Sequence, residues 1–200
     1  MSRFQSNRRL EKNQPVYDDD EENASPEARD NDGEKGGGQN DASSGRDYVN
    51  VPSQPYIMKI LSKQGDRNVL FADRVMKFTG SGKMKKRILL ITEFAIYILD
   101  PDTYALKRRI ALAAVEKLCL SGLGDHFFAI IIPTEYDILM ASTRKSEIVS
   151  ALLEATKSAS DYELDVLYST RFEYHAAADL VKEVQFEEVE GGIKTRILRK

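Results

Sequence analysis

The stretch VLFADRVMKFTGSGKMKKRILLIT, residues 69 to 92, has two runs of strand-forming residues around a glycine-rich break. Residues 69 to 78 (VLFADRVMKF) and 87 to 92 (RILLIT) are rich in β-branched and aromatic residues, which favour strands. Gly80, Ser81 and Gly82 lie between them, and such residues are typical of a turn. The stretch therefore predicts two successive strands joined by a basic turn.

Short apolar runs continue after this hairpin and are separated by turn residues. They predict further strands at 95–99 (AIYIL), 104–112 (YALKRRIAL), 115–121 (VEKLCLS), 126–132 (HFFAIII) and 136–142 (YDILMAS). Next, the spacing predicts a helix over about 144–158, with Ser142 or Thr143 as its N-cap and an apolar face formed by Ile148, Val149, Leu152 and Leu153. Seven strands followed by one helix predict a mainly β fold, a small curved or barrel-like sheet plugged by the helix.

The two ends of the chain add to this core in different ways. Residues 1 to 46 hold almost no large apolar side chains, with 7 Lys or Arg against 11 Asp or Glu, and predict a disordered acidic tail. Residues 47 to 200 form the predicted folded domain, with its core at about 66–160. Extra strand-like pieces follow at 164–176, 181–189 and 192–200.

Targeting and redox signals restrict the compartment. Cys119 is the one cysteine, so no internal disulfide can form and a reducing compartment is expected. The N-terminal residues have no apolar core for a secretory signal, and no apolar run approaches the roughly 18 residues of a membrane-spanning helix. We therefore expect a cytoplasmic protein that reaches a membrane, if at all, from the cytosolic face.

Signatures of catalysis are weak in this sequence. The GSGK at residues 80 to 83 lacks three features of a nucleotide-binding loop: Lys77 stands where a glycine is needed, Met84 where Ser or Thr is needed, and a strand follows instead of a helix. His126 and His175 are the only histidines, and no Cys/His or Asp/Glu spacing suggests a metal site. We expect no enzymatic activity, no cofactor and no metal.

Basic residues gather in the first half of the domain. Residues 59 to 109 carry 12 Lys or Arg and 5 Asp or Glu. Because a strand alternates its side chains, Lys85 and Arg87 point to one side, across the turn from Lys77. These cations can converge on an anion with several phosphates. Lys107, Arg108 and Arg109 predict a second basic cluster on a nearby strand. For the hairpin taken alone, a solvated lysine-rich turn without a ligand is the simpler interpretation.

Residues 47 to 175 resemble the tail homology 1 domain of class I myosins. The matching stretches are DYVNVPSQPYIMKILSKQGDRNVLFADRVMKF (47–78), KRILLITEFAIYILD (86–100), LKRRIALAAVEKLCLSGLGDHFFAIII (106–132) and DILMASTRKSEIVSALLEA (137–155). They occur in the order of the family, and the pieces after LYSTRFEYH match its C-terminal part more loosely. No motor or calmodulin-binding neck stands before the domain in this sequence, so we expect a stand-alone module without actin-driven movement.

The resemblance implies a pleckstrin-homology-like sheet, capped by a C-terminal helix, that binds acidic phospholipids and particularly phosphoinositides. The family's headgroup pattern falls on Lys77, Lys85 and Arg87, with Lys86 as the spacer and Lys83 beside them in the turn. The alternative is an adaptor whose basic face binds an acidic protein, possible partners being cytoskeletal proteins of the actin system. Nucleic acid is not expected, because the hairpin offers little aromatic surface for stacking.

The acidic tail suggests a competitor for the basic face. Its run Asp18, Asp19, Asp20, Glu21 and Glu22 has the sign of charge that the lysines would attract. On this hypothesis, deletion of residues 1 to 46 tightens lipid binding, and equal affinity with and without the tail would contradict it.

Overall fold

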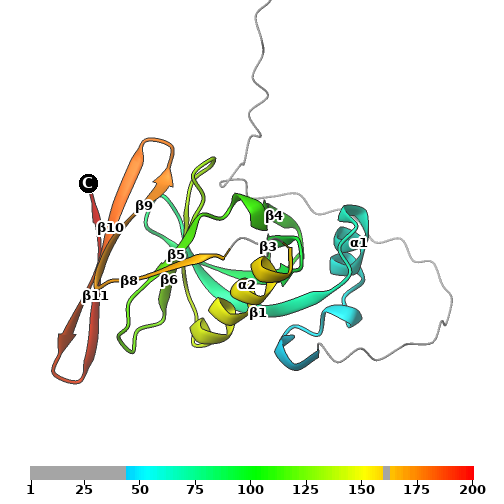
Figure 1. The fold of residues 1–200 in the computed structure, drawn as a ribbon, viewed down its shortest axis with the longest axis horizontal. Coiled ribbons are helices and arrows are strands. Elements are labelled where there is room, and N and C mark those ends of the chain that lie inside the picture. The colour runs from blue at the N-terminus through cyan, green and yellow to red at the C-terminus, as the bar shows by residue number, and fades with distance from the viewer. Residues whose placement is uncertain (1–43, 160–162) are drawn as a thin grey trace, which may run out of the picture. The chain divides into compact units, whose positions relative to one another are not determined.

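Two long antiparallel strands, β1 (Val69–Phe78) and β2 (Met84–Thr92), are central in the computed structural model, which describes residues 44–159 and 163–200 (Figure 1). The predicted acidic tail lies outside the described residues except for 44–46. These three residues form a short 3-10 helix, η1 (Ser44–Arg46), where the guanidinium of Arg46 binds the Glu154 carboxylate with nitrogen–oxygen distances of 2.8 and 3.1 Å.

An eight-stranded sheet grows from this hairpin in the order β4-β3-β2-β1-β7-β6-β5-β8. Neighbouring strands are antiparallel except for β5 and β8, which are parallel. The remaining elements are β3 (Ala95–Leu99), β4 (Leu106–Ala111), η3 (Leu112–Ala114), β5 (Lys117–Leu120), β6 (Phe127–Ile131), β7 (Ile138–Ala141), α2 (Lys145–Ala159) and β8 (Asp165–Tyr168). The structure thus confirms the predicted order of seven strands followed by a closing helix.

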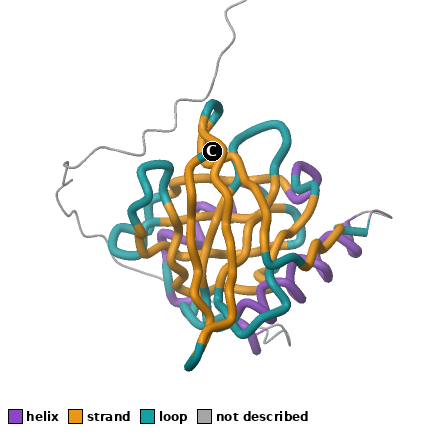
Figure 2. Tube along the Cα trace, turned by 90° about the vertical axis from the view of Figure 1, so that its left-hand side faces the viewer, coloured by secondary structure: helices purple, strands orange, loops and turns teal. Residues whose placement is uncertain are grey.

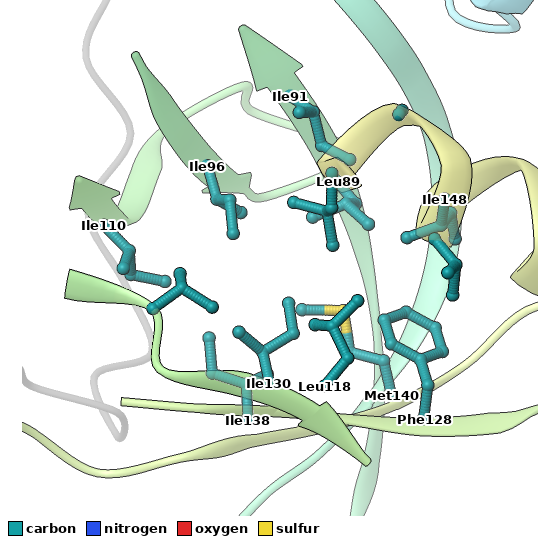
Figure 3. Packing of buried hydrophobic residues seen from close by; sticks show 14 of the residues in the cluster. Leu89, Ile91, Ile96, Ile110, Leu118, Phe128, Ile130, Ile138, Met140 and Ile148 are labelled. Atoms are coloured by element: carbon teal, nitrogen blue, oxygen red, sulfur yellow. The ribbon is translucent and has the colours of Figure 1, made fainter. Parts of the chain in front are cut away.

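Apolar side chains of the two halves of this sheet face each other, because the sheet bends back on itself. Only the end of β1 pairs with β7, through Met76 and Lys77, so β1 joins the two halves. Figure 3 shows the packed residues: Leu89, Ile91, Ile96 and Ile110 from β2 to β4, then Leu118, Phe128, Ile130, Ile138 and Met140 from β5 to β7, and Ile148 from α2. A bent sheet with an apolar interior closed by one helix confirms the expected pleckstrin-homology-like architecture.

A second helix, α1 (Pro55–Gln64), packs on the outer face of β1 to β3, whereas the sequence analysis expected one helix. Ile57 and Leu61 are fully buried there, and Tyr97 is buried opposite them. Pro55 begins the helix, and Gly65, with φ of 79°, ends it in the left-handed conformation that glycine adopts most easily. Ten residues with one short apolar stripe form a weak sequence signal, since such a helix depends on tertiary packing. The short 3-10 helix η2 (Val51–Ser53) precedes it.

The C-terminal strands form a separate three-stranded sheet in the order β11-β10-β9. It consists of β9 (Arg171–Ala177), β10 (Leu180–Val189) and β11 (Gly192–Arg199). Figure 2 looks onto this sheet, whose long strands cross those behind it. Phe172, Val184 and Phe186 pack against the outer face of β5 to β7 in a cluster that includes Cys119. Burial raises the pKa of the Cys119 thiol to about 11.

Neither helix in the described part of the chain is long and apolar enough to cross a bilayer. In the same residues, no group of three or more His, Cys, Asp or Glu is arranged to hold a metal ion.

Candidate functional site

The register of β1 and β2 places three of the predicted cations on one face. Lys77 pairs with Lys85, and Val75 pairs with Arg87. Residues paired across antiparallel strands share a face, and alternate residues of one strand do too. Val75 belongs to the buried core between the two halves of the sheet. Lys77, Lys85 and Arg87 therefore lie on the inner face, at the end of the hairpin where the apolar core stops.

These inner-face cations are more buried than surface lysines usually are. Lys77 is 7% exposed and Arg87 is 9% exposed, whereas Lys85 is half-buried. The Arg87 Nη1 donates a hydrogen bond to the carbonyl of Lys86 at 2.8 Å and lies 3.8 Å from Asp100 Oδ2. Partial burial lowers the local dielectric constant, so each charge acts more strongly on an anion here than in open solvent.

Arg108 of β4 also belongs to this inner face. Its Nη2 donates to Glu135 Oε2 at 2.8 Å and to the Tyr136 carbonyl at 2.7 Å, and its Cζ lies 3.9 Å from the centre of the Tyr136 ring. The Lys77 ammonium lies 6.0 Å from the centre of the same ring. The side chain of Arg108 is almost fully buried, and its Nη1 has no hydrogen-bond partner among the described residues. The Tyr136 loop thus brings the cations of β1 and β4 together.

The second predicted basic cluster is divided by strand alternation. Arg109 lies on the outer face, where its Nε donates to the Tyr97 hydroxyl at 3.1 Å and its Nη2 lies 3.7 Å from Asp66. Lys107 is exposed beside the irregular pairing of β3 and β4. Lys107, Arg108 and Arg109 therefore do not form one patch, because neighbouring residues of a strand point to opposite sides.

The turn between β1 and β2 is held by its own hydrogen bonds. The Thr79 N–H donates to the Lys83 carbonyl at 2.9 Å, and the Lys83 N–H donates to Thr79 Oγ1 at 3.1 Å. Gly82 has a φ of 86°, which favours glycine. Lys83 and Met84 are exposed, and β2 follows the GSGK directly, as predicted, so no helix N-terminus faces the loop. Lys86 is exposed on the outer face, as expected of a spacer.

A cavity of about 470 Å³ lies between the start of β2 and the β3–β4 turn. Four cations contribute to its lining, with two carboxylates on the turn: Arg74, Lys85, Lys86 and Arg87, then Asp100 and Asp102. Burial alone would raise the pKa of Asp100, but hydrogen bonds from the N–H groups of Thr103 and Asp102 lower it. The excess of cations favours an anionic ligand, and the carboxylates weaken that preference.

Three contributors were missed by the sequence analysis: Arg74, Asp100 and Tyr136. Asp100 was recognised only as a turn residue, and Tyr136 only as part of a strand. Neither has a local signal for a site, since each reaches the cations only after the sheet has formed.

A second cavity, of about 460 Å³, lies at the start of α2, where Arg144 binds Asp73 at 2.8 Å. Its hydrogen bond with Asp73 raises the pKa of Arg144.

Known proteins resemble this chain in sequence. The myosin ID heavy chain of Dictyostelium discoideum is 28% identical over 127 residues, or 57% of this chain. The myosin heavy chain IB of Acanthamoeba castellanii is 28% identical over 152 residues, or 72% of this chain. The mouse unconventional myosin-Ia is 25% identical over 161 residues, or 77%. The matched parts span only 12%, 13% and 15% of these relatives' lengths.

Solved structures also resemble this chain. The hSac2 domain of the human phosphoinositide phosphatase Sac2 matches with a TM-score of 0.43 and 12% identity, over 58% of this chain and 90% of that one. The N-terminal PH domain of human ARAP2 matches with a TM-score of 0.37 and 21% identity, over 44% of this chain and 80% of that one.

A sequence model of the tail homology 1 family of myosins, described as "Unconventional myosin tail, actin- and lipid-binding", matches residues 45–199. This match includes both helices and all eleven strands of the described residues. It covers the C-terminal sheet, which the resemblance reached only loosely. The chain therefore belongs to the unconventional myosin tail family.

Proposed function

We propose that this chain is a non-catalytic, peripheral membrane-binding module that holds the headgroup of an acidic phospholipid, a phosphoinositide, at the cytosolic face of a membrane. The observation that carries the proposal is the common inner face of Lys77, Lys85 and Arg87 at the open end of the bent sheet. The family's description as lipid-binding supports it.

Each cation has a physical role in this site. The Lys77 and Lys85 ammoniums act as point charges, whereas the planar guanidinium of Arg87 can donate two parallel hydrogen bonds to one phosphate. Arg108 has an Nη1 that lacks a partner among the described residues, and a phosphate oxygen at the Tyr136 loop would supply one. Leaving a buried donor unsatisfied costs about 1 to 3 kcal/mol, so an anion that satisfies it gains affinity.

General attraction to the membrane adds to this fitted contact. A cation near an anionic leaflet contributes about 1 kcal/mol, so Lys77, Lys83, Lys85, Lys86 and Arg87 together supply at most about 5 kcal/mol. That free energy alone corresponds to a weak and salt-sensitive association. A specific headgroup contact is therefore needed for stable residence on the membrane.

The alternative function is an adaptor that binds an acidic protein, and the family's description as actin-binding is the observation that favours it. A peptide can also add itself to an exposed sheet edge, and among the described residues β4 and β8 end the large sheet while β9 and β11 end the small one. An acidic partner that binds the basic face around Lys77, Lys85 and Arg87 instead would compete with lipid.

Sedimentation with liposomes tests the proposal. The wild-type chain is compared with Lys85→Ala/Arg87→Ala and with the control Lys59→Ala/Lys63→Ala, which removes two exposed charges from α1. We expect the wild type and the control to sediment with phosphoinositide-containing vesicles, and the first variant to remain in solution with its circular dichroism unchanged. Equal loss in both variants would contradict a headgroup site. Failure of the wild type to sediment would favour the adaptor.

A further inference from the structure

The C-terminal sheet reaches the basic turn from the side opposite the proposed headgroup site. A Cβ atom added to Gly80 would lie 3.6 Å from the Ala176 carbonyl oxygen and 3.9 Å from Leu180 Cδ2. A Cβ atom added to Gly82 would lie 3.8 Å from the Nζ of Lys182. The ends of β9 and β10 thus pack directly against the β1–β2 turn. Phe78, on the outer face of β1, belongs to the same contact surface.

Lys182 points its charge into this junction without an acidic partner. Its backbone pairs with Tyr174 on β9 and with Arg199 on β11, so these three side chains share one face of the C-terminal sheet. Lys182 is 9% exposed, and within residues 44–159 and 163–200 its ammonium makes no hydrogen bond or ion pair. The buried Tyr174 hydroxyl likewise lacks a hydrogen-bond partner there.

Carboxylates of the same sheet do not compensate for this charge. Glu173, Glu183 and Glu187 lie on the opposite face, as the alternation along β9 and β10 requires, and Glu188, which shares the face of Lys182, stands six residues away along β10. The three carboxylates of the opposite face are already paired with cations: Glu183 with Arg171, Glu187 with Arg196, and Glu173 with Lys200. A nearly buried ammonium without a counter-ion is unfavourable, and an anion bound from outside would relieve that cost.

We propose that Lys182 and Arg199 form a second phosphate-binding subsite for anionic lipid headgroups, on the opposite side of the β1–β2 turn from Lys77, Lys85 and Arg87. This inference rests on the proposed lipid-binding function. Cations on both sides of the turn direct its tip toward the membrane surface. Met84, which is 58% exposed at that tip, then meets the apolar boundary of the bilayer.

The C-terminal sheet is consequently part of the lipid-binding surface and not only a support for the core. Two headgroup contacts on opposite sides of the turn hold the module more tightly than either contact alone, because the second forms with little further loss of translational and rotational freedom. They also determine how the domain is oriented on the bilayer.

The test uses the full chain and three single variants. Lys182→Met removes the charge but keeps an unbranched apolar stem, and Arg199→Gln removes an exposed charge for which the described residues show no partner. The matched control is Lys194→Met, an exposed cation on the opposite face of the same sheet. Partition coefficients are measured with phosphatidylcholine vesicles that contain phosphatidylserine, with phosphoinositide-containing vesicles, and with inorganic phosphate added as a soluble competitor.

We expect each subsite variant to bind both kinds of anionic vesicle about fivefold more weakly than the wild type, as the loss of one cation at the membrane surface implies. Lys194→Met should retain most of the wild-type affinity. One result would assign the subsite to free phosphate and contradict a lipid site. In that result, inorganic phosphate no longer competes in Lys182→Met, yet the variant binds vesicles as tightly as the wild type. Thermal unfolding checks the fold; should Lys182→Met unfold, Arg199→Gln decides.

Two failures can be told apart. If the wild type binds neither vesicle, the proposed function itself is wrong. If the wild type binds and Lys85→Ala/Arg87→Ala does not, while Lys182→Met and Arg199→Gln match Lys194→Met, only the second subsite is refuted.

Discussion

Lys85 and Lys86 are adjacent in sequence and chemically identical, yet the fold places them on opposite faces of β2. Lys85 pairs with Lys77 on the inner face, and Lys86 pairs with Met76 on the outer face. Exchange of either lysine for methionine changes the net charge by the same amount. Both lysines line the cavity at the start of β2, but only Lys85 shares the inner face with Lys77 and Arg87, so the pair of variants separates the inner-face contact from general attraction to an anionic surface.

The expected magnitudes follow from these positions. Either substitution removes about 1 kcal/mol of long-range attraction, a loss of about fivefold in affinity. Lys85→Met also removes a charge-assisted hydrogen bond to the headgroup, which contributes about 1.5 to 3 kcal/mol and brings its loss to about 60-fold or more. We therefore expect Lys85→Met to bind phosphoinositide vesicles at least about tenfold more weakly than Lys86→Met.

The assay is partitioning onto vesicles with and without phosphoinositide, at about 0.15 M salt, where attraction beyond about 8 Å is screened. On vesicles that contain phosphatidylserine as the only acidic lipid, the two variants should lose affinity to a similar extent. Equal loss on phosphoinositide vesicles as well would refute the inner-face site, since it would mean that only the number of charges matters. Unchanged thermal unfolding of both variants is the control.

Three other outcomes are expected. Asp102→Asn removes a carboxylate from the cavity wall and should strengthen vesicle binding about twofold, as a charge at ~8 Å in water contributes about 0.5 kcal/mol; no change in the partition coefficient would contradict this electrostatic picture. Tyr97→Phe removes one of the two hydroxyl donors to the buried Asp66 carboxylate, the other being Thr92, and should lower the free energy of unfolding by about 1 to 3 kcal/mol in urea titrations. The pKa of Asp100 is below its ordinary value of 3.8 because hydrogen bonds such as that from Thr103 outweigh burial. Its stabilising effect should be present above pH 3.8 and disappear as the pH falls through the lowered pKa. Asp100→Asn should therefore make the free energy of unfolding depend less on pH in this acidic range, and the same pH dependence in both proteins would contradict the argument.

The hydrophobic pattern of the sequence predicted much of the core correctly. The bounds of β1 and β3, residues 69–78 and 95–99, agree with the predicted runs, and α2 begins and ends within one residue of its prediction. This succeeds because side-chain burial repeats every two residues in a strand and about every 3.6 in a helix, so each pattern is visible locally. The same alternation predicted that Lys85 and Arg87 point to one side, whereas the register of β1 and β2 shows that Lys77 shares their face.

Other parts of the site depended on the tertiary structure. The sequence treated Lys107, Arg108 and Arg109 as one cluster, but only Arg108 reaches the Tyr136 loop, and its contact there joins β4 to residues 27 and 28 positions away. The pairing of β8 with β5 and the approach of Lys182 to Gly82 span still longer separations. The sequence alone determined which side chains alternate in and out of each strand. Only the tertiary structure decided which strands meet, because the order of strands and the bend of the sheet depend on packing between distant segments, which local periodicity does not encode.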